Sequence, residues 1–106
     1  MSRWSQIEQT EPLEVTGDTT VELSPGYNRI IVTSTAILTF KSFASWGSSR
    51  VSVTRKGANA TLRWYSGDTV NNSVADILLD EDYMHCELEA LSDTEGLAKG
   101  DFIKPS

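Results

Sequence analysis

The only residues that could form a cysteine–histidine dyad are adjacent, because His85 is the single histidine and Cys86 the single cysteine. A cysteine nucleophile needs a histidine base within hydrogen-bond reach of its sulfur. Residues 83–91 alternate between apolar and polar side chains, which predicts a strand whose neighbouring side chains point to opposite faces of a sheet. We therefore expect a buried Cys86, a solvent-facing His85 and no catalytic dyad.

Three consecutive acidic residues, Asp80-Glu81-Asp82, lie shortly before His85. Carboxylate oxygens are the ligands that hard divalent cations prefer in proteins. An EF-hand loop that began at Asp80 would need glycine at its sixth position, which is occupied here by His85. We therefore expect no metal site and interpret the run as a solvated acidic turn.

Other catalytic motifs are missing from the sequence. It contains no G-x-S-x-G, no P-loop and no G-x-G-x-x-G, so acyl transfer, nucleotide hydrolysis and dinucleotide binding lack their usual signatures. A chain of 106 residues also leaves little room for the cleft that glycoside hydrolysis requires. The sequence predicts a protein that is not an enzyme and binds no cofactor.

The charge of the chain is unevenly distributed. The net charge is -6, and residues 76–106 hold nine acidic residues but only two lysines. Binding to a phosphate backbone depends on clustered Lys and Arg, so we expect no direct contact with nucleic acid. An acidic face could instead meet a basic partner. The residues assigned to this candidate acidic face are Asp80, Glu81, Asp82, Glu87 and Glu89.

The start of the chain has no apolar segment after Arg3, and no run is long enough to cross a membrane. A single cysteine cannot form an internal disulfide, so nothing requires an oxidising compartment. We expect a protein without a secretion signal that folds in a reducing cytoplasm and does not contact a membrane.

From Pro12 onward, short runs rich in Val, Ile, Thr and Leu are cut every six to ten residues by Gly, Pro, Asn or Asp. This pattern predicts an all-β fold, a single-domain β-sandwich or jelly-roll-like barrel of about eight short antiparallel strands. Residues 1–11 lack the pattern and are interpreted as an N-terminal arm before a β-domain at 12–106. The expected strands cover 13–15, 19–23, 29–33, 36–40, 50–55, 60–65, 74–79 and 83–91.

Two parts of this assignment depend on local signals. Residues 50–55 and 60–65 alternate on either side of a turn at 56–59, which predicts a β-hairpin. Residues 74–79 fit either a helical turn or a buried strand, and we favour the strand. Residues 92–100 are rich in turn formers, and 101–104 could be a short closing strand or a tail.

The large aromatic residues differ in their expected burial. Trp64 shares a strand face with Leu62 and is expected in the core, whereas Trp46 lies in a serine-rich loop without a periodic apolar partner. Aromatic side chains that a monomer does not cover often mark an interface or a sugar-stacking platform. The candidate interaction residues are Trp4, Ile7, Tyr27 and Trp46.

Residues 19–23, the turn Ser24-Pro25-Gly26-Tyr27-Asn28 and residues 29–40 together resemble strand pairs in small virion proteins of tailed bacteriophages, the capsid-decorating and fibre-base proteins. The resemblance implies a non-enzymatic virion protein that is assembled in the host cytoplasm and binds coat protein or another virion protein. It also implies a capsid decoration (cement) role, a possible homotrimer, and an arm that adds a strand to a neighbour's sheet, with Trp4 and Ile7 as anchors.

Two other functions remain open from the sequence. A carbohydrate-binding module could stack sugars on Trp46, Tyr65 or Tyr27. An acidic decoy could inhibit a nucleic-acid enzyme by presenting carboxylates in place of phosphates. The residues that would do so are Asp76, Asp80, Glu81, Asp82, Glu87 and Glu89.

Overall fold

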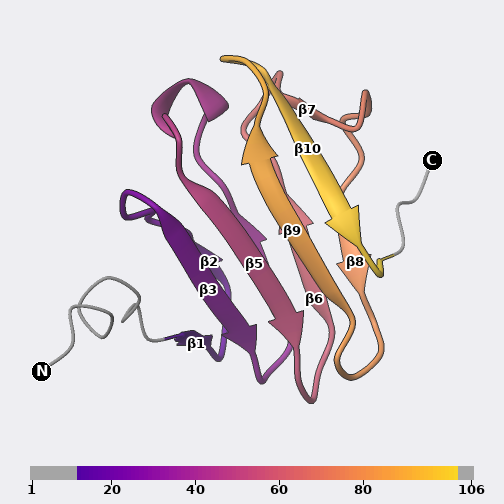
Figure 1. Cartoon of the computed structure of the whole chain (residues 1–106). Coiled ribbons are helices and arrows are strands. Elements are labelled where there is room, and N and C mark those ends of the chain that lie inside the picture. Colours follow the sequence, from indigo (N-terminus) through magenta and orange to yellow (C-terminus); the bar gives the residue numbers. More distant parts are fainter. Residues whose placement is uncertain (1–11, 103–106) are drawn as a thin grey trace, which may run out of the picture.

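The computed structural model describes residues 12–102, which form strands and one short 3-10 helix, so the predicted all-β class is confirmed (Figure 1). Trp4, Ile7 and the rest of the predicted arm lie outside the described residues. The elements are β1 (Leu13–Val15), β2 (Thr19–Thr20), β3 (Tyr27–Val32), β4 (Ala36–Thr39), η1 (Phe43–Ser45), β5 (Arg50–Arg55), β6 (Ala60–Arg63), β7 (Thr69–Val70), β8 (Ile77–Leu79), β9 (His85–Ala90) and β10 (Glu95–Gly100).

The strands form two mixed sheets. The larger sheet has six strands in the order β1-β3-β5-β9-β10-β7, and the smaller has four in the order β2-β4-β6-β8. From β1 to β9 the chain passes from one sheet to the other after every strand. It therefore winds into successive coils, each made of one strand of the larger sheet and the following strand of the smaller sheet. The arrangement is therefore β-solenoid-like.

The antiparallel strand pairing predicted for a sandwich or jelly roll is wrong. Five of the eight strand pairings are parallel, including β1 with β3, β3 with β5 and β4 with β6. Alternating short strands and turns fit both architectures, because side-chain alternation reports which face of a strand is buried and not which strand lies beside it.

The predicted hairpin of residues 50–55 and 60–65 is also wrong, since β5 belongs to the larger sheet and β6 to the smaller. The turn at 56–59 instead connects the two sheets. It is held by neighbouring coils: Lys56 N–H donates to Val32 O at 2.7 Å, and Ala36 N–H donates to Asn59 O at 3.1 Å. The turn residues were identified correctly, but their partners lie in another coil.

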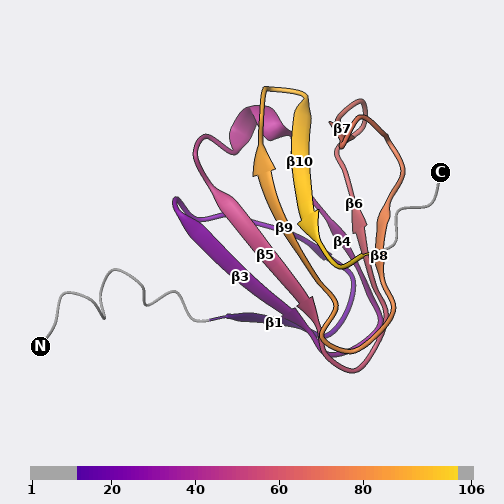
Figure 2. The same cartoon turned by 45° about the vertical axis from the view of Figure 1, so that its right-hand side comes forward.

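Figure 2 shows that the two sheets meet at one end and diverge at the other. The short turns at 33–35, 56–59 and 80–84 connect the sheets at the narrow end, while the longer connection at 40–49 crosses the wide end. The wide end therefore needs bulky side chains to fill it.

The C-terminal strands match the sequence prediction in part. β8 and β9 lie within the predicted strands 74–79 and 83–91. Residues 92–100, predicted as turns, contain the six-residue strand β10, so that prediction is wrong. Its two glycines suggested turns, but Gly96 is buried inside the strand against Phe43. Residues 103–104 of the alternative closing strand lie outside the described residues.

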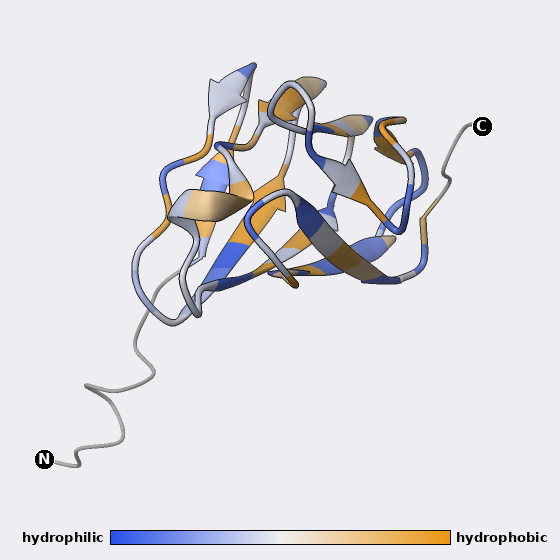
Figure 3. Cartoon of the chain, turned by 90° about the horizontal axis from the view of Figure 1, so that it is seen from above, coloured by the Kyte–Doolittle hydropathy of each residue, from blue (hydrophilic) through white to orange (hydrophobic). Residues whose placement is uncertain are grey.

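The core lies between the two sheets. Buried and exposed side chains alternate along β3, β5 and β9, and Figure 3 shows the same alternation of hydrophobic and hydrophilic residues along the ribbon. The largest fully buried side chains include Phe40, Leu38, Leu62, Ile77 and Leu79. Each sheet thus has one inner face in the core and one outer face in solvent.

Candidate functional site

Trp46 is not on the surface, which corrects the expectation that it belongs to an interface. It is 3% exposed, and its indole N–H donates to Lys41 O at 3.1 Å. Its ring lies 4.7 Å from that of Phe43 and 5.8 Å from that of Phe40. Trp64 joins the same cluster and is 7% exposed, as predicted. These four rings fill the wide end between the sheets.

The loop that carries Trp46 is anchored through its backbone at the start of η1. The Ser42 hydroxyl accepts from Ala44 N–H at 3.2 Å, and the Asp68 carboxylate accepts from Phe43 N–H at 2.9 Å. Asp68 is only 4% exposed. The serine before Phe43 was a usable capping signal, whereas nothing local in the sequence indicated the contact with Asp68.

The His85 and Cys86 side chains are placed as predicted. Cys86 is fully buried in the core, and the burial pattern of β9 puts His85 on the outer face of the larger sheet. The sheet lies between imidazole and thiol, so the pair cannot act as a nucleophile and its base.

The predicted acidic residues lie in two neighbouring parts of the chain, the turn before β9 and β9 itself. Asp82 belongs to the narrow end, where its carboxylate lies 2.7 Å from Arg55 Nη1 and accepts from Gly57 N–H at 2.8 Å. Asp80 and Glu81 lie in the same turn, whereas Glu87 and Glu89 lie on β9. Within residues 12–102, no group of three His, Cys, Asp or Glu side chains is placed to hold a metal ion.

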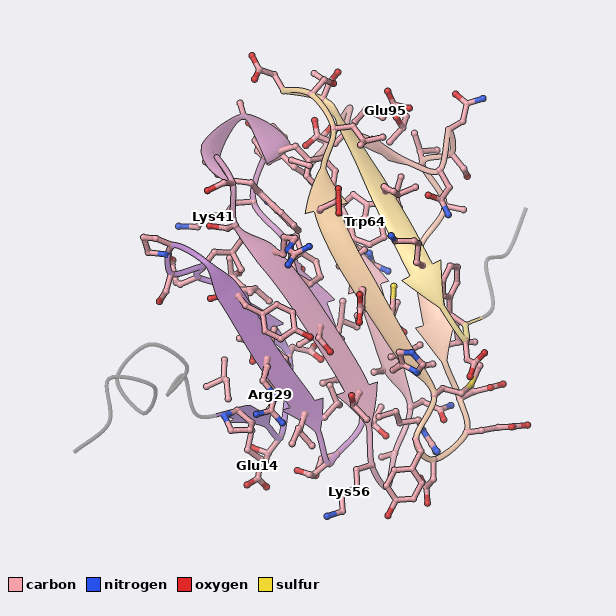
Figure 4. The ribbon with its side chains drawn as sticks, viewed as in Figure 1. Glu14, Arg29, Lys41, Lys56, Trp64 and Glu95 are labelled. Carbon is pink, nitrogen blue, oxygen red and sulfur yellow. The ribbon has the colours of Figure 1, made fainter. Side chains whose placement is uncertain are left out.

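The outer face of the larger sheet is the first candidate surface. Its central strands β3, β5 and β9 present Tyr27, Arg50 and Glu89 side by side in register, and the same row continues to Leu97 of β10. The next row contains Arg29, Ser52, Glu87 and Lys99. Figure 4 shows Arg29 on this face, turned toward the viewer, and Trp64 behind the sheet. A hollow of about 330 Å³ lies along these rows and is lined by Tyr27, Arg50, Val51, Glu87, Leu88, Glu89 and Lys99.

The second candidate surface, here called the open coil end, is the side of the molecule where both sheets begin. β1 is the edge of the larger sheet and β2 the edge of the smaller, so the first coil has no coil stacked outside it among the described residues. A hollow of about 340 Å³ lies there, lined by Leu13, Val21, Glu22, Leu23, Ser24, Asn28, Arg29 and Ile30. Leu13 is 49% exposed. Sequence analysis missed this surface because it results from the order of the strands.

One buried residue shapes the open coil end. Asn28 accepts from Ser24 N–H at 2.8 Å, and its amide nitrogen lies 2.9 Å from Ser24 O, 3.2 Å from Gly26 O and 3.1 Å from Arg50 O. The asparagine therefore closes the turn between β2 and β3 and ties it to the next coil. Its residue type matched the predicted turn, but its burial was not predicted.

Comparison with known proteins assigns no family: no family model, curated protein or solved structure matches the chain. In the part of the chain that the structure describes, no helix is long and apolar enough to span a membrane. Function therefore has to be inferred from the two surfaces.

Proposed function

We propose that the protein is a non-enzymatic structural protein that joins protein subunits, and that the open coil end is its main binding site. The observation that supports this proposal is the first coil, which no other described residues cover and which has two strand edges and a partly apolar hollow on the same side. An unpaired strand edge offers backbone N–H and C=O groups to an incoming strand. The exposed Leu13 adds apolar area beside that edge.

The solenoid-like winding explains why this end suits a partner. Each coil buries its inner residues against the next coil, and among residues 12–102 no coil is stacked on the outer side of the first. A strand from a neighbouring subunit would extend the sheet beyond β1 and cover the hollow in one step. Such binding adds buried area and backbone hydrogen bonds, and it stabilises whatever assembly supplies the strand.

The class of partner comes from the resemblance to virion proteins. The residues that carry it, 19–40, form β2, β3 and β4, which lie in the first two coils at the open coil end. The proposed role is accordingly that of a capsid decoration protein that binds neighbouring coat subunits in a virion. Residues 1–11, with Trp4 and Ile7, directly precede β1 and would reach the same subunits.

The two rival functions lose part of their support. The carbohydrate-binding hypothesis named Trp46, Tyr65 and Tyr27, of which Trp46 is buried and the two tyrosines are exposed. The decoy hypothesis relied on a continuous set of carboxylates, but Asp82 is paired with Arg55 and Asp76 with Arg63. The hydrogen bond to Asp76 raises the pKa of Arg63 above its already high ordinary value.

Binding to empty shells tests the proposal. Shells purified from tailed bacteriophages and stripped of their own decoration proteins serve as the probe, and binding of the full chain is measured by co-sedimentation. Leu13→Asp should lower binding about tenfold or more, because it puts a charge into the interface. The matched control is Val74→Asp, which changes a side chain that is 71% exposed before β8, the edge strand at the far end of the smaller sheet. Failure of the unmodified chain to bind any shell would contradict the decoration role.

A further inference from the structure

We propose that the outer face of the larger sheet is a two-fold interface between two copies of this chain. This goes beyond the binding of coat subunits and uses a different surface. The relevant feature is the row Tyr27–Arg50–Glu89–Leu97, which crosses β3, β5, β9 and β10 in register.

The row is complementary to itself. A two-fold axis that runs along the strands between β5 and β9 brings β5 of one copy over β9 of the other, and β3 over β10. Arg50 then faces the second copy's Glu89, and Tyr27 faces the second copy's Leu97. Each contact occurs twice, as an isologous interface requires. Opposite charges meet at the centre, and an aromatic ring meets an aliphatic side chain on either side.

The charged groups of this face are available for such contacts. Within residues 12–102, the side chains of Arg29, Arg50, Glu87, Glu89 and Lys99 take no part in a hydrogen bond or ion pair, whereas Arg55, Arg63 and Lys41 each have a carboxylate partner. Tyr27 is 45% exposed although it is large and aromatic. Tyrosine and arginine are enriched at interfaces, and opposite charges on facing surfaces fix the register of a pair.

The second row contributes less to the same arrangement. The axis places Arg29 opposite the second copy's Lys99, and Ser52 opposite its Glu87. The two contacts between Arg29 and Lys99 bring like charges together, which lowers the affinity of the pair. The interface therefore depends on the row Tyr27–Arg50–Glu89–Leu97.

The size of the face limits the affinity. Four strands of six residues or so cover roughly 15 by 20 Å, about 300 Å² on each copy, which is less than the total of about 1,000 Å² that stable interfaces bury. We therefore expect a weak, transient dimer with a dissociation constant in the high micromolar range. Such weak pairing becomes effective when both copies are held on the same assembly.

A charge-swap experiment on the full chain tests the interface. Sedimentation equilibrium over a wide range of micromolar concentrations should show a monomer–dimer equilibrium for the unmodified protein. Arg50→Glu and Glu89→Arg should each weaken it by about tenfold or more, because each puts like charges opposite each other twice. The double variant should restore dimerisation to within roughly threefold. Asp93→Arg makes the same charge change as Glu89→Arg in the exposed turn before β10 and should have no effect.

Several results would overturn this inference. These are a monomer at every concentration, a trimer, or single variants whose defect the double variant does not rescue. A monomer that binds glycans on an array and loses that binding with Tyr27→Ala would show that the hollow holds a sugar instead. Leu13→Asp lies outside this face and should leave the dimer intact, so failure of this interface and failure of the open coil end can be told apart.

Discussion

Gly96 of β10 lies directly against the ring of Phe43, so closely that a Cβ on residue 96 would come within 2.8 Å of Phe43 Cε2. Phe43 leads the short helix that carries Trp46 into the wide end of the molecule. Because Gly96 has no side chain, β10 leaves space for the aromatic cluster that lies between the two sheets.

Gly96→Ala should destabilise the protein by about 1–3 kcal/mol, because the added methyl group overpacks a filled core. The free energy of unfolding from urea titrations, followed by tryptophan fluorescence, measures this change. Gly17→Ala is the matched control, since a Cβ there meets no atom within 4 Å and Gly17 is not in the left-handed backbone region. Equal stability of the two variants would mean that the Phe43 ring moves aside without cost.

Asn28→Ala should cost about 2–4 kcal/mol, since it removes several hydrogen bonds and leaves Ser24 N–H and Arg50 O at a part-buried site without their partner. Asn59→Ala, at an exposed asparagine bonded to Arg55, should change stability by less than about 1 kcal/mol. The same denaturation measurement checks both. A small effect at residue 28 would show that water replaces the amide.

Trp46 and Tyr27 should respond in opposite ways to truncation. Trp46→Ala should lower the free energy of unfolding by about 3–5 kcal/mol, because it empties part of the core. Tyr27→Ala should change stability by less than about 1 kcal/mol but weaken dimerisation. A Trp46→Ala protein with unmodified stability would contradict the burial of that ring.

Asp82→Ala should destabilise the narrow end by about 1–2 kcal/mol, because both the Arg55 guanidinium and Gly57 N–H lose their acceptor. Asp93→Ala removes an exposed carboxylate from the turn before β10 and should be nearly neutral. Thermal unfolding followed by circular dichroism compares the two. If Asp82→Ala is as stable as Asp93→Ala, the ion pair with Arg55 contributes nothing measurable.

The strands of this protein were largely predictable from its sequence, and their neighbours were not. Alternation identified β5 and β9, and a continuous β-branched run identified most of β3, which in the structure also buries every second side chain. Strand pairing depends on which sheet the chain joins after each turn. The residues of the turn at 56–59 fit a hairpin within one sheet as well as a connection between two sheets. That ambiguity contributed to the prediction of an antiparallel sandwich, whereas the sheets are mixed and the fold is solenoid-like.

The candidate surfaces depend on pairing even more strongly. Tyr27 was predicted as an interaction residue from its place beside a turn, but its row with Arg50 and Glu89 exists only because β3, β5 and β9 are neighbours. Trp46 was misplaced because the loop shows no periodic pattern, although its partners Phe40 and Phe43 lie in the same connection between β4 and β5. Whether an aromatic side chain of this loop is buried depends on the space between the two sheets at the wide end.

Backbone amide exchange with and without phage shells tests the subunit-joining role of the open coil end most directly. Amides of residues 13–15 and 19–20 lie on edge strands and should exchange more slowly once the protein is bound, while those of Ile77–Leu79 at the other end of the smaller sheet should not change. Shell binding that leaves residues 13–20 unprotected would contradict the account.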